Sequence, residues 1–514
     1  MLVTSKGELG MEHGDPPSER EDFSSSRRSL NIALVSDYFF PKVGGVESSI
    51  YNLAQSLVKR GHRVRGASIL LNLDAVRLTL SSEQVVVITH AYPPRNGVRW
   101  LPNGVKVYYV PVQPLPPTHV HATLPNFFTA FPWIRSILTR ECIEVVHAHA
   151  ALSALGMETI MHARTMGVKA VFTDHSLFGL GNMAEIWGNK MLKGCLSDVE
   201  AVTCVSHTSK ENTVLRGALN PSLVHVIPNA VVVSQFRPTE PVPPVPDILT
   251  IVCISRLVYR KGIDLLIAAL PKVCALHSDV RFLIGGDGPK IVELDQMRDK
   301  YQTLLRNRVE LLGAVKHEDV RELLSRAQIF LNPSLTEAFG IGILEAACAG
   351  LFVVSTRVGG VPEVLPPGLV EFAEPDVDDL VRAISRAITH VRSGSHDPLL
   401  AHDQLRQVYS WTDVAERTER VYYHAMSVPR VPLVERLRRY YGTGAVFGKI
   451  MCIVIIVDYI LLAVMDYLSP RDKMDRAPKF DLERWKRICR DELEKEKEAD
   501  LRERREAGID GGNI

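Results

Sequence analysis

The sequence predicts a two-domain α/β protein, and three observations lead to this prediction. From Asn31 onward, short runs rich in β-branched residues alternate with amphipathic stretches, which is typical of a parallel sheet covered by helices. A proline-rich stretch, residues 237–247, interrupts the alternation and reads as a linker, and a second series follows it. Residues 445–465 form one long apolar segment outside both series. We therefore expect two doubly wound Rossmann-like domains with a cleft between them, plus one C-terminal hydrophobic helix.

The composition is that of a globular protein with a substantial core. The chain has 514 residues, of which 46% are hydrophobic and 23% charged, and this excludes a disordered chain and a polytopic membrane protein. Lys and Arg number 60 against 59 Asp and Glu, a net charge of +1. This balance argues against a nucleic-acid partner. The eight cysteines are scattered without a C-x-x-C pair, which favours free thiols in a reducing compartment.

The first series predicts an N-terminal, acceptor-side domain over residues 30–236. Its candidate strands begin at Asn31, Val85, Val105, Glu144, Val168, Ala201 and Val224. Residues 1–29 are polar, contain no apolar run long enough for a signal peptide, and are expected to be disordered. Residues 65–84 are not needed by the alternation, so they are either a surface insertion or a gene-model artefact.

The second series predicts a C-terminal, donor-binding domain over residues 248–400, followed by a helical crossing segment at 401–428. Its candidate strands begin at Leu249, Val280, Val309, Ala327 and Phe352. Because each strand is followed by a helical stretch, we expect the second domain to resemble the first.

The apolar segment at residues 445–465 is close to the ~20 residues that cross a bilayer. Its only charged residues are Lys449 and Asp458. We expect a transmembrane or membrane-embedded helix, with a buried core helix as the alternative. A charge inside a membrane helix needs a polar partner, so we expect another subunit's helix to meet Asp458. Residues 470–514 form a charged tail, either a solvated helix or a disordered arm.

Two motifs at predicted strand ends suit an anionic ligand. Gly44 and Gly45 lie between the first strand and a helix, where backbone N–H groups can approach an anion, although such glycines also serve packing. Arg256 and Lys261 follow the first strand of the second domain. Because ligands of doubly wound sheets bind beyond the carboxyl ends of the strands, two cations there can neutralise a diphosphate. The alternative is that both are solvated loop charges.

Two glutamates form the strongest constellation. Glu337 and Glu345 follow a strand that ends near Asn332, and Gly340 and Gly342 indicate that a loop precedes the next helix. We therefore expect Glu337 in the loop and Glu345 in the helix, both able to face the cleft. The apolar neighbours of Glu345 indicate that its carboxylate needs a partner or a ligand.

Histidines and aspartates give weaker signals. His175 ends a strand where it can reach a cleft, although a satisfied core histidine is the usual alternative. His147 and His149 have metal-like spacing, but with no third ligand in view zinc is not expected. Asp376 and Asp378 resemble a D-x-D motif, yet helix capping is the favoured interpretation. No metal site is predicted.

These motifs resemble a known family. GGVE at Gly44, R-x4-K at Arg256, GGDGP at Gly285 and the two glutamates eight apart are similar to the retaining glycosyltransferases of the GT-B fold. Within that fold, the strings VSDYFFPKVGGVE, VFTDHSLFG, SRLVYRKGIDLL, LNPSLTEAF and STRVGGVPEVLP resemble the PIG-A family, the catalytic subunits of phosphatidylinositol N-acetylglucosaminyltransferase. The resemblance covers residues 31–466 apart from 65–84.

The resemblance implies transfer of N-acetylglucosamine from UDP-GlcNAc to phosphatidylinositol with retention of configuration, the first step of GPI-anchor biosynthesis. It implies no metal or other cofactor, and partner subunits of a GPI N-acetylglucosaminyltransferase complex. It also implies the endoplasmic reticulum membrane, with cytosolic catalytic domains, a single pass and a short lumenal tail. Because residues 65–84 lie near where this family meets the membrane, they leave acceptor binding open.

The resemblance also implies roles for individual residues. The catalytic set is Glu337, His175, Arg256 and Lys261. The substrate-binding set is Gly44, Gly45, Glu345, Gly286 and Gly288. In the first set the two cations hold the diphosphate, while the glutamate and the histidine contact the transferred sugar. In the second set the glycine pair cradles the β-phosphate and the glutamate holds the ribose hydroxyls.

Three competing functions remain open from the sequence. A glycosyltransferase of the same fold acting on another acceptor is the first, and a sugar-nucleotide epimerase, which needs no lipid, is the second. A non-catalytic scaffold protein is the third. The apolar segment argues against the first two, and the four charged motif residues together argue against the third.

Overall fold

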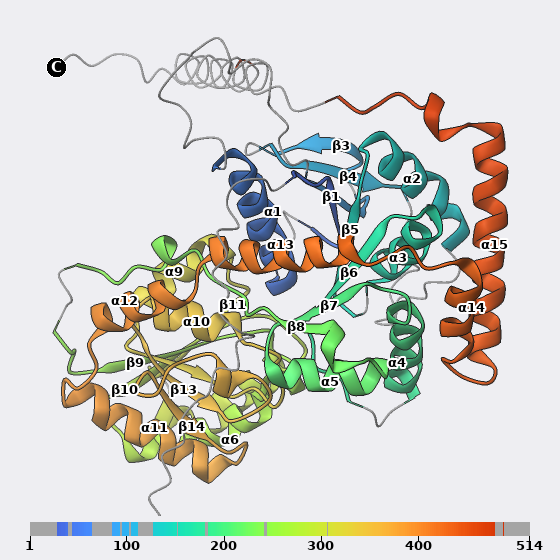
Figure 1. Cartoon of the computed structure of the whole chain (residues 1–514). Helices are drawn as coiled ribbons and strands as arrows, with labels where there is room; N and C mark the ends of the chain where they lie inside the picture. Colours follow the sequence, from blue (N-terminus) through green and yellow to red (C-terminus); the bar gives the residue numbers. More distant parts are fainter. Residues whose placement is uncertain are drawn as a thin grey trace, which may run out of the picture.

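The computed structural model has two α/β domains side by side, with the last helices packed on the first domain (Figure 1). It describes residues 28–39, 44–63, 85–92, 95–101, 104–111, 127–151, 153–179, 183–240, 244–305, 307–478 and 487. The segment at 65–84, most of the N-terminal 29 residues and most of the tail from residue 470 lie outside the described residues. The predictions made for those three segments stay predictions.

The first domain is built on a sheet with the strand order β3-β4-β2-β1-β5-β6-β7-β8. Its strands are β1 (Ile32–Val35), β2 (Val85–His90), β3 (Gly97–Trp100), β4 (Lys106–Val110), β5 (Val145–His149), β6 (Lys169–Asp174), β7 (Ala201–Cys204) and β8 (Val224–Val226). Neighbouring strands pair in parallel, except β3, which is antiparallel to β4. The central strands are buried on both faces, which explains why their sequences are rich in apolar residues and do not alternate with exposed polar ones.

Helices cover both faces of this first sheet. They are α1 (Gly45–Arg63), α2 (Phe127–Arg140), α3 (Ala154–Met166), α4 (Met183–Leu196) and α5 (His207–Gly217). One core cluster joins α2, α3 and α4 to the sheet, and another joins α1 to the opposite face. Every residue of α3 is buried, because further helices cover its outer side.

The second domain has an all-parallel sheet with the strand order β11-β10-β9-β12-β13-β14. Its strands are β9 (Leu249–Ile254), β10 (Val280–Gly285), β11 (Val309–Gly313), β12 (Ile329–Asn332), β13 (Phe352–Thr356) and β14 (Val370–Ala373). Its helices are α6 (Ile263–Leu276), α7 (Ile291–Lys300), α8 (Gln302–Leu305), α9 (His317–Ser325), α10 (Ile341–Cys348), α11 (Val377–Arg392) and α12 (Pro398–Val408). Two doubly wound domains are confirmed.

The capping interpretation of the D-x-D motif is also confirmed. The Asp376 carboxylate accepts hydrogen bonds from the backbone N–H groups of Asp378 and Asp379, each at 3.0 Å. These are the first N–H groups of α11, which have no partner within the helix. The Asp376 carboxylate therefore stabilises the start of α11.

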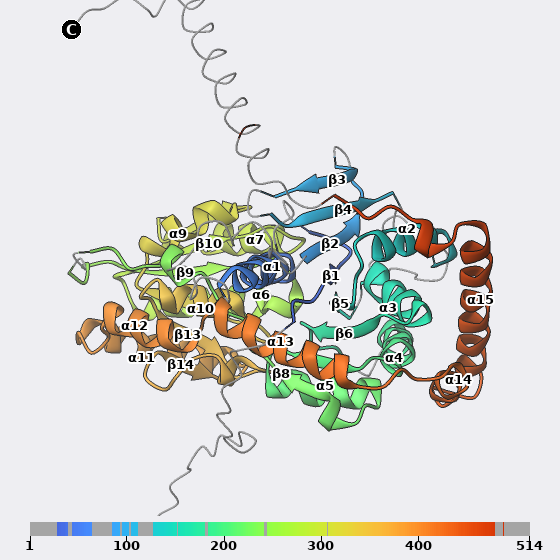
Figure 2. The same ribbon diagram turned by 45° about the horizontal axis from the view of Figure 1, so that its top comes forward.

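After α12 the chain returns to the first domain. Helix α13 (Trp411–Ser427) begins beside the second domain and lies along α1 and β6 of the first (Figure 2). Its residues Ala415, Val421, Tyr422 and Ala425 join the core on the α1 face. The return places a C-terminal helix across both domains.

The last two helices, α14 (Leu433–Tyr441) and α15 (Phe447–Leu468), pack on the outer side of the first domain. Helix α15 is long and apolar enough to cross a membrane, with a mean hydropathy of 2.4 in its most apolar 18-residue window. Asp458 lies on its inner face, and its carboxylate is 2.7 Å from Nδ1 of His162 in α3. The expectation that a separate protein supplies this partner was wrong, because α3 of the same chain provides it.

Candidate active site

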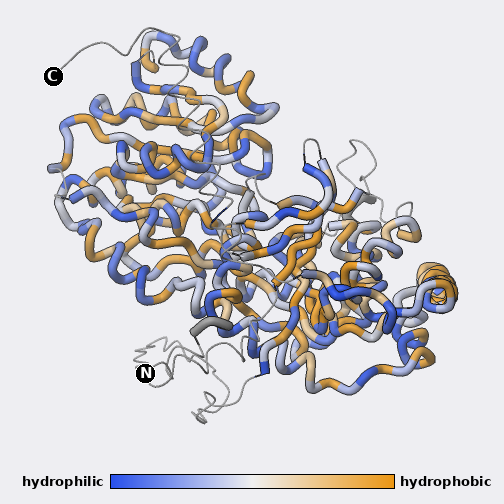
Figure 3. The backbone as a smooth tube through the Cα atoms, turned by 90° about the horizontal axis from the view of Figure 1, so that it is seen from above, coloured by the Kyte–Doolittle hydropathy of each residue, from blue (hydrophilic) through white to orange (hydrophobic). Residues whose placement is uncertain are grey.

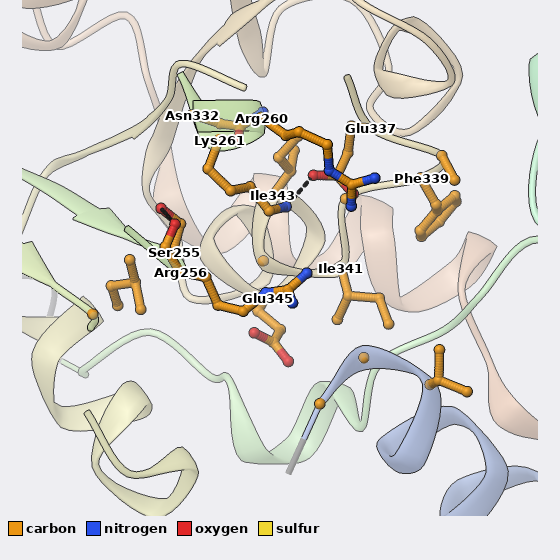
Figure 4. A pocket seen from close by; sticks show the side chains of 18 of the residues that line it. Ser255, Arg256, Arg260, Lys261, Asn332, Glu337, Phe339, Ile341, Ile343 and Glu345 are labelled. Carbon is orange, nitrogen blue, oxygen red and sulfur yellow. Dashed lines mark hydrogen bonds and ion pairs between the residues drawn. The ribbon is translucent and has the colours of Figure 1, made fainter. Parts of the chain in front are cut away.

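A cleft of about 650 Å³ opens between the two domains (Figure 4). It lies beyond the carboxyl ends of β6, β9 and β12 and at the N-terminus of α1. The structure brings together in its lining most of the residues selected from the sequence: Gly44, Gly45, His175, Arg256, Lys261, Gly286, Glu337 and Glu345. Gly288 is not among the lining residues.

Lys261 and Glu337 form an ion pair at the edge of the cleft (Figure 4). Gly262, with φ +69°, lets the chain turn immediately after the lysine, and a Cβ there would lie 1.7 Å from the carbonyl oxygen of Pro333. Only a glycine allows this approach, which places the lysine beside the loop after β12. The two side chains are 24% and 18% exposed, so the pair is accessible to a ligand in the cleft.

The Glu337 loop is held from behind by a double glycine. The Gly360 N–H donates to the carbonyl oxygen of Glu337 at 3.0 Å. At Gly359, with φ +52°, a Cβ would lie 2.2 Å from the same oxygen. Sequence reasoning gave these glycines no role, although a Gly-Gly pair directly after a strand was a usable signal for a close backbone approach.

Contacts between the domains meet beside this loop. Ser206 of the first domain donates from Oγ to the carbonyl oxygen of Ala338, at 2.7 Å. The Glu363 carboxylate of the second domain accepts from the backbone N–H groups of His207 and Thr208, at 2.6 and 3.0 Å, at the start of α5. A carboxylate at a helix N-terminus is also favoured by the helix dipole. These contacts fix the spacing of the two domains at the cleft.

Arg256, in the loop after β9, and Glu345, in α10, are directed into the cleft (Figure 4). Helix α10 begins at Ile341, so Glu337 lies in the loop and Glu345 lies inside the helix, as expected. Burial raises the pKa of the Glu345 carboxyl to about 7. Among the described residues no ion pair holds Arg256, so its guanidinium is available to an anion.

His175 follows β6 and is positioned by a second histidine. Its Nε2 lies 3.1 Å from Nδ1 of His149. Burial lowers the pKa of His175 to about 4 and that of His149 well below its usual range. Both rings are therefore neutral at pH 7, and one ring N–H donates to the other ring. Sequence reasoning considered His149 only as a metal ligand and missed this contact.

His147 is a buried core histidine. Its Nδ1 lies 2.7 Å from the Tyr422 hydroxyl and its Nε2 lies 2.5 Å from the Thr173 hydroxyl. Over the described part of the chain, no group of three His, Cys, Asp or Glu side chains is placed to hold a metal ion. Metal independence stays a prediction.

The glycines of the β10–α7 loop let it lie against the Arg256 loop. A Cβ at Gly286, with φ +142°, would lie 1.8 Å from the carbonyl oxygen of Ser255. A Cβ at Gly288, with φ +154°, would lie 2.5 Å from the carbonyl oxygen of Leu257. Gly286 therefore combines packing with a place in the cleft, whereas Gly288 contributes through packing.

Comparison with known proteins agrees with this geometry. Residues 90–182 match the family model described as PIGA (GPI anchor biosynthesis), and residues 249–390 match that of the group 1 glycosyl transferases. Among solved structures, sucrose-phosphate synthase from Thermosynechococcus elongatus superposes with a TM-score of 0.61 at 19% identity, over 77% of this chain and 99% of that one. Anabaena HepE in complex with UDP has a TM-score of 0.56 at 16% identity, over 77% of this chain and 100% of that one.

Much closer relatives are found by sequence. The gpi3 subunit of phosphatidylinositol N-acetylglucosaminyltransferase from Schizosaccharomyces pombe is 49% identical, over 86% of this chain and 91% of the relative. The corresponding subunit of the same enzyme from Arabidopsis thaliana is 50% identical, over 87% and 94%. The corresponding Homo sapiens protein is 43% identical, over 88% and 89%.

Two parallel-sheet domains facing each other across a cleft with cations and carboxylates define a glycosyltransferase of the GT-B fold. Within that class, the chain belongs to the PIGA family of phosphatidylinositol N-acetylglucosaminyltransferase subunits, whose yeast members are named GPI3. The resemblance read from the sequence motifs is confirmed.

Proposed function

We propose that this chain transfers N-acetylglucosamine from UDP-GlcNAc to phosphatidylinositol with retention of configuration, as the first step of GPI-anchor synthesis. The observation that carries the proposal is the Lys261–Glu337 ion pair, which borders the cleft between the domains beside Arg256. The names of the close relatives support the choice of sugar and acceptor.

The charges of the cleft suit a nucleoside diphosphate sugar. Arg256 and Lys261 hold the diphosphate, and the N–H groups at Gly44 and Gly45 cradle its β-phosphate. The Glu345 carboxylate, which lines the cleft, accepts hydrogen bonds from the ribose hydroxyls. When the sugar–phosphate bond breaks, negative charge grows on the β-phosphate oxygen. Fixed cations at that point lower the barrier without a metal ion, because they need no reorganisation as the charge develops.

The bond changes are confined to one face of the sugar. The bond between C1 and the β-phosphate oxygen breaks, and a bond from C1 to an inositol oxygen forms on the same face. The departing phosphate oxygen takes the proton of the inositol hydroxyl, so no protein base is required. Glu337 contacts the sugar hydroxyls while Lys261 neutralises its charge.

His175 contacts the sugar near C1. Because its burial keeps the ring uncharged at pH 7, it does not repel the positive charge that develops at that carbon. His149 holds the ring in place. His175 thus orients the sugar and leaves proton transfer to the substrate phosphate.

The proposed setting is the endoplasmic reticulum membrane, with the catalytic domains in the cytosol and other subunits of the transferase complex as partners. The close relatives are named as subunits, which supports a multi-subunit assembly. The one described helix that could span a membrane supports membrane association.

Incubating the membrane-bound complex with labelled UDP-GlcNAc and phosphatidylinositol tests the proposal. We expect label in a chloroform-soluble lipid whose formation depends on phosphatidylinositol. Label transferred to another acceptor would indicate a different glycosyltransferase, and an epimerised free sugar nucleotide would indicate an epimerase. Activity that persists when Lys261 and Arg256 are both replaced by alanine would make the chain a scaffold.

A further inference from the structure

In α15 the distribution of polar and apolar residues is the reverse of that in an ordinary surface helix. Between Ile450 and Val464, every exposed side chain of α15 is apolar. Five large aliphatic ones recur every three or four residues and are 42–62% exposed: Ile450, Ile453, Ile456, Ile460 and Val464. Its inward face carries the only acid between them, Asp458, which is fully buried against His162. A helix at a water interface has polar residues outside and apolar residues inside. The outward stripe of α15 therefore suits an apolar environment. Figure 3 shows α15 as a largely hydrophobic helix at the edge of the molecule.

The start of α15 is anchored on the first domain. Arg436 of the preceding α14 donates from Nε to the Asp198 carboxylate at 2.5 Å, and both side chains are buried. The Phe447 ring, in the first turn of α15, meets the Trp187 ring of α4 edge to face, with 6.2 Å between centroids. The helix therefore begins in contact with α4.

The end of α15 is anchored on the same domain. The Arg135 guanidinium of α2 forms an ion pair with Asp466 at 2.7 Å and donates to the carbonyl oxygen of Ser469. Beyond the helix, the Ala477 N–H donates to the carbonyl oxygen of Arg140 at 2.9 Å. The chain that leaves α15 thus returns to the domain from which it entered.

The contacts of α15 with the first domain, at both ends and in the middle of the helix, conflict with a transmembrane arrangement. At ~1.5 Å per residue the helix is as long as the ~30 Å hydrocarbon core, so a spanning α15 would carry α2, α3 and α4 into the bilayer. Figures 1 and 2 both show these helices beside α15 along its length. Charged side chains of these helices, such as Arg140 and Lys193, would be drawn in with them, and charges are costly inside a bilayer.

We propose that α15 lies in the plane of the membrane, with its outward stripe in the boundary between headgroups and acyl chains, and that both of its ends stay on the side of the catalytic domains. This replaces the single pass with a lumenal tail that the sequence predicts. Trp187, which meets Phe447 at the start of α15, and Trp133 on the neighbouring α2 are half-exposed, and tryptophan is a side chain that favours this boundary. Exposed Arg438, Arg439 and Lys449 attract anionic headgroups.

A topology experiment on the full chain separates the two arrangements. An N-glycosylation acceptor is appended after Ile514 and the complex is made in sealed microsomes. We expect an unmodified tail that is cleaved by protease added outside. As a positive control, a 20-residue Leu/Ala span inserted after Pro478 must bring the same acceptor into the lumen. A glycosylated tail without that insert would overturn the proposal.

A binding experiment tests the lipid contact itself. Full-length Ile453→Glu and Ile460→Glu variants should fold as the wild type and float at least tenfold less with vesicles of phosphatidylcholine and phosphatidylinositol. Leu400→Glu, an equally exposed leucine on α12 of the other domain, is the matched control and should float normally. Unchanged flotation of both isoleucine variants would show that protein, not lipid, covers the stripe. Neither experiment needs sugar transfer, so each fails independently of the proposed reaction.

Discussion

Two ion pairs of the same chemistry lie in very different surroundings. The Lys261–Glu337 side chains are 24% and 18% exposed at the cleft, whereas the Arg436–Asp198 side chains are 1% and 0% exposed beneath α14. In a partly exposed pair, the lysine can exchange its carboxylate partner for a substrate anion at little cost, because water reaches both charges. A fully buried pair cannot, because separating it leaves a charge without solvent. We infer that the accessible Lys261–Glu337 pair takes part in the reaction, whereas the buried Arg436–Asp198 pair stabilises the fold.

Breaking the buried pair should have the largest effect on stability. Asp198→Ala leaves the buried Arg436 without its carboxylate, so we expect a loss of about 3–5 kcal/mol in the free energy of unfolding. Denaturant unfolding of the detergent-solubilised protein measures it. Asp295→Ala removes an exposed pair with Arg298 and should cost at most about 1 kcal/mol. Equal losses in the two variants would refute the contrast.

Breaking the cleft pair should spare stability and remove activity. Lys261→Ala should lower the transfer rate by about 10² or more, the effect of losing one contact to transition-state charge, with an unchanged unfolding midpoint. Lys272→Ala on α6, which removes an exposed ion pair with Asp378 of α11, is the control and should leave the rate unaltered. Near-normal turnover in a well-folded Lys261→Ala variant would remove the cleft pair from the mechanism.

Glu345 should make donor binding depend on pH. Burial raises its carboxyl pKa to about 7 in the free protein, so the carboxylate is lost as the pH falls through that value. In the proposed mechanism this carboxylate accepts hydrogen bonds from the ribose hydroxyls. We expect the KM for UDP-GlcNAc to rise below about pH 7, by at most tenfold per pH unit. Glu345→Gln should flatten this dependence. A profile identical in both proteins would assign the titration elsewhere.

His149 should act through His175. Replacing His149 with Ala removes the hydrogen bond that orients the His175 ring, and we expect kcat to fall about tenfold while the KM for the donor changes little. His149→Gln, which can still donate and accept, should restore part of the rate. A variant that loses only thermal stability would show that the His149 contact is merely structural.

Removal of metal ions should have no effect. Because the proposed mechanism neutralises the diphosphate with two cations and helix N–H groups, we expect the rate to survive saturating EDTA. The assay is sugar transfer with and without chelator. Complete loss that Mn²⁺ or Mg²⁺ restores would contradict the account and return attention to carboxylates near the cleft.

The sequence predicted what depends on local pattern. Continuous apolar runs located the buried strands, and the glycines at 340 and 342 placed Glu337 and Glu345 correctly around the start of α10. Strands β3 and β14 were missed, because their residues are largely exposed or half-buried and lack the apolar signature. Edge strands are selected by pairing with a neighbour, which a single window of sequence does not contain.

Partners far apart in the chain were beyond sequence reasoning. His162 and Asp458 are 296 positions apart, and His149 and His175 meet only because β5 and β6 are adjacent. Hydrophobic periodicity and composition describe one helix or strand at a time. The sequence therefore led us to expect that the partner of Asp458 belongs to a different protein. Tertiary packing supplied the partner instead.

The configuration at C1 of the product tests the central claim most directly. Labelled N-acetylglucosaminyl-phosphatidylinositol made by the wild-type complex is isolated, and its anomeric linkage is determined by NMR. Transfer at one face of the sugar, with the departing phosphate accepting the inositol proton, predicts the α linkage of the donor. A β-linked product would contradict it, because inversion requires a base on the opposite face of the sugar.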